Sequence, residues 1–145
     1  MKTIARIACL LLILSGYVLA MPATVFARDN AQSPVVVLTS EGSITPVLIE
    51  YLERGLKIAG ERGAQTLILQ LDTPGGSVDI MNKIVQIIRN SDIPVVVYVS
   101  PRNAMAGSAG TVITLAGHVA AMAPETTIGA ASPVGSEGED IGETI

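Results

Sequence analysis

Runs of aliphatic residues recur along the chain, and apolar positions between these runs follow a different spacing. Three runs, at 35–38, 66–71 and 94–99, are rich in Val, Ile and Leu, and a shorter run lies at 119–122. Short apolar runs of this kind are typical of buried strands, and nearly continuous ones of a parallel sheet covered on both faces. The pattern therefore predicts four strands in a buried sheet.

The stretches between these runs carry apolar residues every three or four positions, the spacing of an amphipathic helix. The first stretch begins at Thr45-Pro46, a favourable helix start, and Gly60 and Gly63 are expected to end the helix. The two apolar faces comprise Leu48, Leu52, Leu56 and Ala59, and then Met81, Ile84, Val85 and Ile88. A third helix is expected to begin at Ser108. This alternation predicts an α/β fold with a mainly parallel sheet.

Two short segments consist mostly of very small residues. Pro74-Gly75-Gly76 follows the strand at 66–71, and Ser108 lies within the Ala- and Gly-rich run 104–110. Proline presets φ for a turn, and glycines adopt backbone conformations closed to other residues. Such a turn can direct N–H groups at an oxyanion or a phosphate, although no GxGxxG or Walker pattern supports the phosphate. Ser108 would expose its hydroxyl at a helix start; a closely packed helix with an incidental serine is the alternative.

A serine hydroxyl needs a base to become a good nucleophile. The single histidine, His118, follows Ser108 by ten residues, which is about 15 Å along a helix at ~1.5 Å per residue. We expect its imidazole to meet the terminal carbonyls of that helix instead. Lys57 and Lys83 lie off the apolar faces of their helices and are expected to be solvated. Asp72 is expected to cap the neighbouring turn through local hydrogen bonds.

Composition excludes several classes of function. Residues 28–145 carry seven Lys and Arg against thirteen Asp and Glu, and the whole chain has a formal net charge of −4. Without a basic patch, nucleic acid is not expected as a partner. The single cysteine, Cys9, lies near the N-terminus, so neither a disulfide nor a thiolate metal site is expected. No cofactor and no metal are predicted, and aromatic residues, at 3%, leave the core aliphatic.

Residues 1–27 have the pattern of a secretory signal peptide. Lys2 and Arg6 precede an apolar stretch at 7–14, and Val25-Phe26-Ala27 offers a small-residue cleavage site. An uncleaved membrane anchor is the alternative, because no charge occurs from residue 7 to residue 27. In either case we expect the remaining domain, 28–145, to lie outside the cytoplasm.

Five segments taken in order resemble one family of proteins. They are Leu71-Asp72-Thr73-Pro74-Gly75-Gly76, then 93–99, then Ala106-Gly107-Ser108-Ala109-Gly110-Thr111, then 121–124, and then 128–135. The set is similar to NfeD-type membrane-bound serine proteases of the ClpP/crotonase superfamily, which are close to signal peptide peptidase A. The resemblance implies repeated β-β-α units around the sheet, incomplete at the C-terminal end, so that 28–145 would be a truncated protease domain.

The resemblance also implies a catalytic site. Ser108 matches the family's nucleophile, and the backbone N–H groups of Gly75, Gly76 and Ala109 match its oxyanion hole. The family uses a Ser–Lys dyad, and this chain has no lysine after Lys83. The base is therefore expected beyond the last residue, and the chain as it stands is expected to be inactive.

Substrate and location follow from the same resemblance. It implies an endopeptidase that cleaves hydrophobic segments of proteins, acts beside stomatin-type membrane partners and forms homo-oligomers. A non-catalytic interaction module, or pseudoprotease fragment, is the second hypothesis. A crotonase-like acyl-CoA enzyme is the third, and the signal sequence disfavours it. The acidic, Gly-rich stretch 133–140 is predicted to be a loop.

Overall fold

The computed structural model describes residues 34–132, all within one compact unit, Gln32–Ile145. The elements in chain order are β1 (Val35–Glu41), α2 (Pro46–Glu61), β2 (Thr66–Asp72), α3 (Val78–Arg89), β3 (Val95–Val99), β4 (Met105–Gly107), α4 (Ala109–Ala116), β5 (Val119–Met122) and β6 (Thr127–Gly129). The predicted signal peptide and the predicted loop at 133–140 lie outside the described residues. No helix in the described range is long and apolar enough to cross a bilayer.

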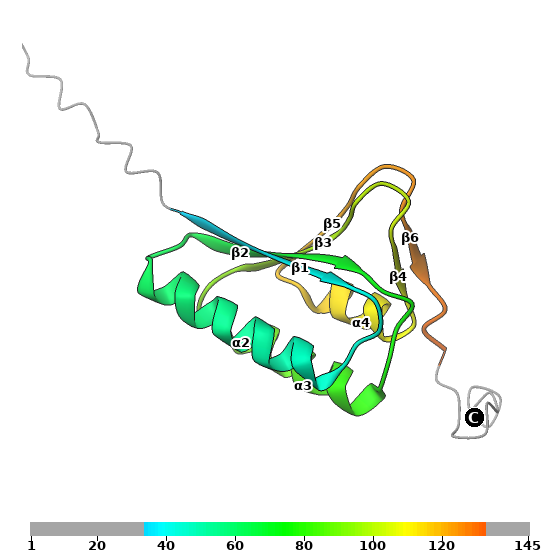
Figure 1. The fold of residues 1–145 in the computed structure, drawn as a ribbon, viewed down its shortest axis with the longest axis horizontal. Coiled ribbons are helices and arrows are strands. Elements are labelled where there is room, and N and C mark those ends of the chain that lie inside the picture. Colours follow the sequence, from blue (N-terminus) through cyan, green and yellow to red (C-terminus); the bar gives the residue numbers. More distant parts are fainter. Residues whose placement is uncertain (1–33, 133–145) are drawn as a thin grey trace, which may run out of the picture. The chain divides into compact units, whose positions relative to one another are not determined.

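Four strands form the main sheet, in the order β1-β2-β3-β5, and every neighbouring pair is parallel. The four predicted strands are these four, so the predicted α/β class with a parallel sheet is confirmed. A second parallel pair, β4 and β6, extends from the carboxyl ends of the main strands (Figure 1). Isolated bridges join Ile44 to Gly76 and Thr73 to Ala106, which bring the two small-residue segments into one region.

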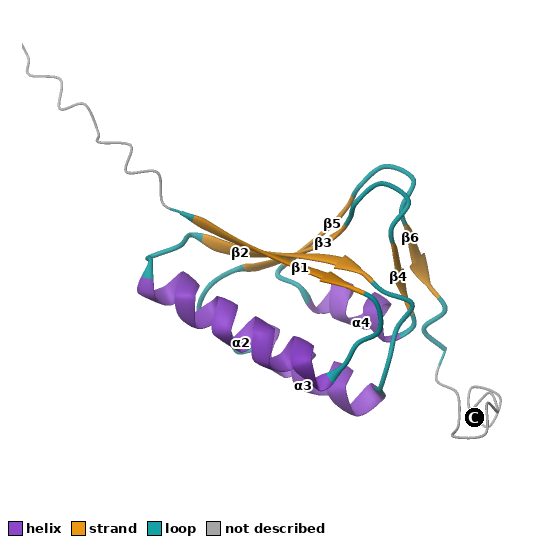
Figure 2. Cartoon of the chain, viewed as in Figure 1, coloured by secondary structure: helices purple, strands orange, loops and turns teal. Residues whose placement is uncertain are grey.

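The three helices lie on the same face of the main sheet (Figure 2). Side chains alternate along β2, so that Leu67, Leu69 and Leu71 are fully buried while Ile68 and Gln70 on the other face are only half-buried. The expectation that both faces of the sheet are covered is therefore not met within residues 34–132. The apolar run along β2 is continuous because the residues on the second face of the sheet are also partly apolar. The sequence therefore does not show that helices cover only one face, and the three-dimensional structure does.

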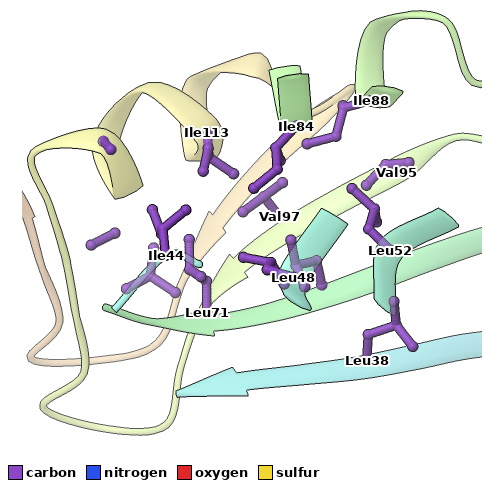
Figure 3. Close-up of a cluster of buried hydrophobic side chains, with 14 of the residues drawn as sticks. Leu38, Ile44, Leu48, Leu52, Leu71, Ile84, Ile88, Val95, Val97 and Ile113 are labelled. Atoms are coloured by element: carbon purple, nitrogen blue, oxygen red, sulfur yellow. The ribbon is translucent and has the colours of Figure 1, made fainter. Parts of the chain in front are cut away.

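The core between helices and sheet is aliphatic, as the composition predicts (Figure 3). Its fully buried side chains include Leu52 from α2, Ile84 and Ile88 from α3, and Ile113 from α4. Burying one such side chain contributes roughly 1.5–3 kcal/mol relative to leaving it in water. The helical faces predicted from periodicity thus fix how α2 and α3 pack against the sheet.

The ends of α2 follow the local sequence. Pro46 occupies the first turn, where a proline loses no intrahelical hydrogen bond, although Thr45 makes no side-chain cap. The helix passes through Gly60 and ends at Glu61, and Gly63 then adopts a left-handed φ of +60°. The Ala64 N–H donates to the Ala59 carbonyl at 2.8 Å, which closes the end of the helix.

The pair β4 and β6 is absent from the sequence prediction. Each strand has three residues, and Met105-Ala106-Gly107 has neither the β-branched content nor the alternation of a strand. Tertiary pairing holds the segment extended: the Thr73 N–H donates to the Met105 carbonyl at 2.7 Å, and the Gly107 N–H donates to the Thr73 carbonyl at 2.9 Å. These bonds pair Thr73, which directly follows β2, with the segment that leads to Ser108.

Candidate functional site

Ser108 occupies a sharp turn between β4 and α4. Its φ of 51° and ψ of −117° form a backbone conformation that is unfavourable for a residue with a side chain. Two hydrogen bonds hold it: the Ser108 N–H donates to the Gly129 carbonyl at 2.8 Å, and the Thr111 N–H donates to the Ser108 carbonyl at 3.0 Å. The turn leaves Ser108 exposed, and its hydroxyl does not cap the helix. A strained backbone thus presents a hydroxyl that α4 does not use.

The helix that follows presents an N–H group next to this hydroxyl. Ala109 is the first residue of α4, and N–H groups of a first helical turn have no intrahelical acceptor. In the described part of the chain, the Ala109 N–H donates to no carbonyl or side chain. The aligned peptide dipoles add a partial positive charge at this end of the helix. The position is therefore suited to a developing negative charge.

The glycine turn between β2 and α3 packs directly against the serine. Gly75 has a φ of +122°, and a Cβ placed on it would lie 2.8 Å from the Ser108 Cβ and 3.0 Å from the Gly107 carbonyl oxygen. A Cβ on Gly76 would lie 2.5 Å from the Ile44 carbonyl oxygen. Side chains at either position would push the two segments apart. The absence of side chains is what brings the turn into contact with Ser108.

The N–H groups of this turn differ in availability. The Gly75 N–H donates to the buried Thr73 Oγ1 at 3.0 Å, so an acceptor within the protein already occupies it. The Gly76 N–H has no acceptor among residues 34–132. Three N–H groups are predicted for an oxyanion hole. That of Gly75 is engaged, whereas those of Gly76 and Ala109 find no acceptor between residues 34 and 132.

A cavity of about 240 Å³ adjoins these groups. Its lining comprises Gly76, Val78, Met81, Ser108, Ala109, Val112, Ala131 and Ser132. Ser108 and the residues of both unengaged N–H groups therefore face the same space, beside an apolar wall from α3 and α4. No titratable side chain belongs to this lining as far as the structure describes the chain. The cavity thus brings together an exposed serine hydroxyl, two unengaged N–H groups and an apolar wall, and no side chain of residues 34–132 in its lining can act as a base.

The two lysines considered as bases, Lys57 and Lys83, do not line this cavity. Lys57 lies on the exposed side of α2, where its Nζ is 4.0 Å from a carboxylate oxygen of Glu61, four residues later. Lys83 is exposed on α3. Both sequence predictions of solvated lysines are confirmed.

His118 has a structural role that differs from the prediction. Its Nδ1 accepts a hydrogen bond from the Val95 N–H at 3.1 Å, and the backbone N–H of His118 donates to the Val95 carbonyl at 2.9 Å. The prediction that its imidazole meets the carbonyls of the preceding helix is therefore wrong, because the chain turns away at Gly117 and runs alongside β3. The ring serves as an acceptor that joins the starts of β3 and β5, and it does not line the cavity of Ser108.

Asp72 also differs from its prediction of a local cap. Its Oδ1 accepts a hydrogen bond from the Met105 N–H at 2.9 Å, across 33 positions of sequence. The carboxylate therefore ties the end of β2 to the start of β4. Sequence pattern gives no sign of this partner, because the two segments become neighbours only when the sheet forms.

Two threonines near the site were not singled out from the sequence. Thr73 is fully buried, and its Oγ1 binds the Gly75 N–H. Thr111 is 8% exposed and contacts the backbone of Gly129. A threonine among small and apolar residues indicates a buried hydrogen bond, but its partner is decided by tertiary contacts.

Comparison with known proteins gives a consistent result. The family model described as "NfeD1b, N-terminal domain" matches residues 34–145. The membrane-bound protease PH1510 of Pyrococcus horikoshii is 46% identical over 104 residues, which are 72% of this chain and 24% of that protein. Membrane protein NfeD1b of Bacillus subtilis is 36% identical over 104 residues, 72% of this chain and 23% of that protein. The chain thus spans about a quarter of the length of these curated relatives.

Solved structures agree with the fold. A lysine-to-alanine mutant of the stomatin-specific protease 1510-N, in complex with a substrate peptide, has a TM-score of 0.70 at 44% identity and covers 77% of this chain and 52% of that one. A serine-to-alanine mutant of 1510-N has a TM-score of 0.68 at 45% identity, with 70% and 49% covered. A ClpP1 mutant of Listeria monocytogenes, at 22% identity and a TM-score of 0.57, covers 71% of this chain and 58% of that one and shares the fold. The predicted ClpP-like fold is confirmed.

Proposed function

Because the chain belongs to the family of NfeD1b N-terminal domains, we propose that it is the N-terminal part of a membrane-associated, extracytoplasmic serine endopeptidase. The observation that carries the proposal is the shared cavity of Ser108 with Gly76 and Ala109, whose N–H groups are unengaged within residues 34–132. A relative is named a membrane-bound protease, which supports the same class of activity.

In the proposed reaction, Ser108 Oγ attacks the carbonyl carbon of a peptide bond. The carbonyl oxygen then becomes an oxyanion, which accepts hydrogen bonds from the N–H groups of Gly76 and Ala109. One donor of this kind contributes about 3–4 kcal/mol to the stability of the transition state. We assign Gly75 a steric role, because its N–H is held by Thr73 and its missing Cβ lets the turn contact Ser108.

The base of the proposed Ser–Lys dyad is a lysine beyond Ile145. Removing a lysine from water disfavours its charged form, so a buried amine can accept a proton near neutral pH. In the 1510-N mutants, the replaced serine and lysine are further apart along the chain than Ser108 is from Ile145. That spacing supports a base outside these residues. A continuing reading frame without any lysine in its next few tens of residues would refute the assignment.

The apolar wall of the cavity indicates the substrate. Val78, Met81 and Val112 stand beside Ser108 and are suited to an aliphatic side chain next to the cleaved bond. We propose hydrophobic segments of proteins as substrates, and a stomatin-type membrane protein as a partner by analogy with the specificity named for 1510-N. We further propose that the enzyme acts as a homo-oligomer.

The test uses the gene product extended to its natural end and purified in detergent. Cleavage of a Leu- and Val-rich peptide is followed by mass spectrometry for the parent, for Ser108→Ala and for Ser43→Ala. Ser43 is an exposed serine outside the cavity, so its variant serves as the matched control. We expect the parent and the control to cleave and Ser108→Ala to be inactive. Equal cleavage by all three would refute Ser108 as the nucleophile.

One observation favours the alternative of a non-catalytic interaction module. No titratable side chain lines the cavity in the part of the chain that the structure describes. If the parent and Ser108→Ala are both folded, bind the peptide with equal affinity and leave it intact, the interaction module becomes the better description.

A further inference from the structure

The side chain of Thr111 connects the first turn of α4 to β6. Its Oγ1 accepts a hydrogen bond from the Gly129 N–H at 3.0 Å. The same oxygen lies 2.7 Å from the Gly129 carbonyl oxygen and 2.8 Å from the Ala106 carbonyl oxygen. Since a hydroxyl carries one hydrogen, it donates to one of these carbonyls at a time. One side chain thus links α4, β4 and β6.

Gly129 is also the residue that supports the turn of Ser108. Its carbonyl accepts the Ser108 N–H at 2.8 Å, at the end of the short ladder between β4 and β6. β6 has only three residues, and the bonds of Thr111 to Gly129 add to the pairing with β4 that holds it. Ala131 and Ser132, just beyond Gly129, form part of the cavity wall. Movement of Gly129 would therefore change both the serine turn and the wall.

We propose that Thr111 is a positioning residue for the nucleophile. Its hydroxyl fixes Gly129, and Gly129 fixes the strained backbone of Ser108 and the direction of the adjacent Ala109 N–H. The catalytic consequence of this inference rests on the proposed peptidase function. The hydrogen bonds between Thr111 and Gly129, called the clamp below, are a property of the fold. Thr111 does not line the cavity, so it acts through Gly129 and not on the substrate.

The same helix provides a matched control. Thr114 is 1% exposed, and its Oγ1 donates to the Gly110 carbonyl at 2.8 Å, within α4 itself. Replacing either threonine by valine removes one buried hydroxyl and keeps the side-chain shape. Only the change at Thr111 removes a connection between α4 and β6.

The first experiment measures peptide cleavage by the full-length protein in detergent. For Thr111→Val we expect kcat to fall by about 10²-fold, the loss associated with a displacement of about 1 Å at a reacting group. KM should stay near that of the parent, because the apolar wall of α3 and α4 is retained. Thr111→Ser should recover most of kcat, and Thr114→Val should keep it. A parent-like kcat for Thr111→Val, an equal loss in Thr114→Val, or no recovery in Thr111→Ser would overturn the proposal.

Should Thr111→Val fail to fold, Thr111→Cys replaces it, because a thiol keeps a weak donor and a weak acceptor. For Thr111→Cys we expect kcat to fall by less than the about 10²-fold expected for Thr111→Val. KM should again stay near that of the parent. A kcat equal to that of the parent would overturn the proposal in this form.

The second experiment separates the clamp from the peptidase activity. Hydrogen exchange of the full-length protein is followed by mass spectrometry in peptides that cover 105–110 and 127–130. Thr111→Val, or the cysteine variant, should exchange faster than the parent in both peptides, and Thr114→Val should not. If the parent has no peptidase activity but this exchange pattern is found, the proposed function fails and the clamp stands. Unchanged exchange in both peptides would refute the clamp, whatever the activity.

Discussion

Replacing Gly75 by alanine tests whether close packing of the glycine turn defines the site. The alanine Cβ would lie 2.8 Å from the Ser108 Cβ and 3.4 Å from the Ser108 Oγ. It would also force a φ of +122° on a residue with a side chain. Gly42 supplies a matched control, because its φ is +91° and a Cβ there would meet no atom of the described residues within 4 Å.

The expected magnitude follows from these two effects. A left-handed backbone costs a residue other than glycine about 1–2 kcal/mol, and this cost applies to both variants. Forcing an extra methyl group into a packed region costs about 1–3 kcal/mol more, and this cost applies to Gly75→Ala alone. We therefore expect the free energy of unfolding to fall by about 1–2 kcal/mol in Gly42→Ala and by about 2–5 kcal/mol in Gly75→Ala.

Pulse proteolysis of the purified protein in increasing urea measures this free energy. A fluorophosphonate that labels reactive serines, applied to the gene product extended to its natural end, provides a second measurement in the absence of urea. We expect Gly75→Ala to lower the labelling of Ser108, because the alanine displaces the serine turn, and Gly42→Ala to preserve it. The reasoning would be refuted if the two variants lost equal stability and were labelled equally, since contact with Ser108 would then have no effect.

Two further predictions concern stability away from the site. Gly60→Ala should raise the free energy of unfolding by about 0.5–1 kcal/mol, because Gly60 lies inside α2 and, among residues 34–132, a Cβ would meet only the Ile93 Cδ1, at 3.9 Å. A lower free energy of unfolding, measured by pulse proteolysis, would contradict this. His118→Ala should lower the same quantity by about 1–3 kcal/mol, because the Val95 N–H loses its acceptor, while peptide cleavage is retained. A loss of cleavage in a folded His118→Ala protein would contradict the structural role of the ring.

Local sequence patterns determined much of the architecture. The apolar runs gave the strands of the main sheet, and the spacing of residues such as Leu52 and Ile84 gave the buried faces of α2 and α3. These signals are readable because period and composition act within one element, where neighbouring residues alone decide the outcome. The strands β4 and β6 escaped prediction because their extended form depends on pairing with distant segments.

The sequence also identified the segments that meet at the site. Ser108 and the glycine turn contain the small residues that a close approach of two backbones requires, and the structure brings them into contact. It did not reveal which N–H groups remain unengaged. Gly75 and Gly76 are adjacent and identical in type, yet among the described residues only the N–H of Gly75 meets a side-chain acceptor.

The difference has one physical reason. Periodicity, turn residues and the serine motif involve residues that are close along the chain. The sequence by itself therefore determined the four strands of the main sheet, the three helices, the family resemblance and the candidate nucleophile. Hydrogen-bond partners depend on which segments lie side by side after folding. Only the tertiary structure therefore decided that Asp72 binds the Met105 N–H, that His118 joins β3 to β5, and that Thr111 is hydrogen-bonded to Gly129 of β6.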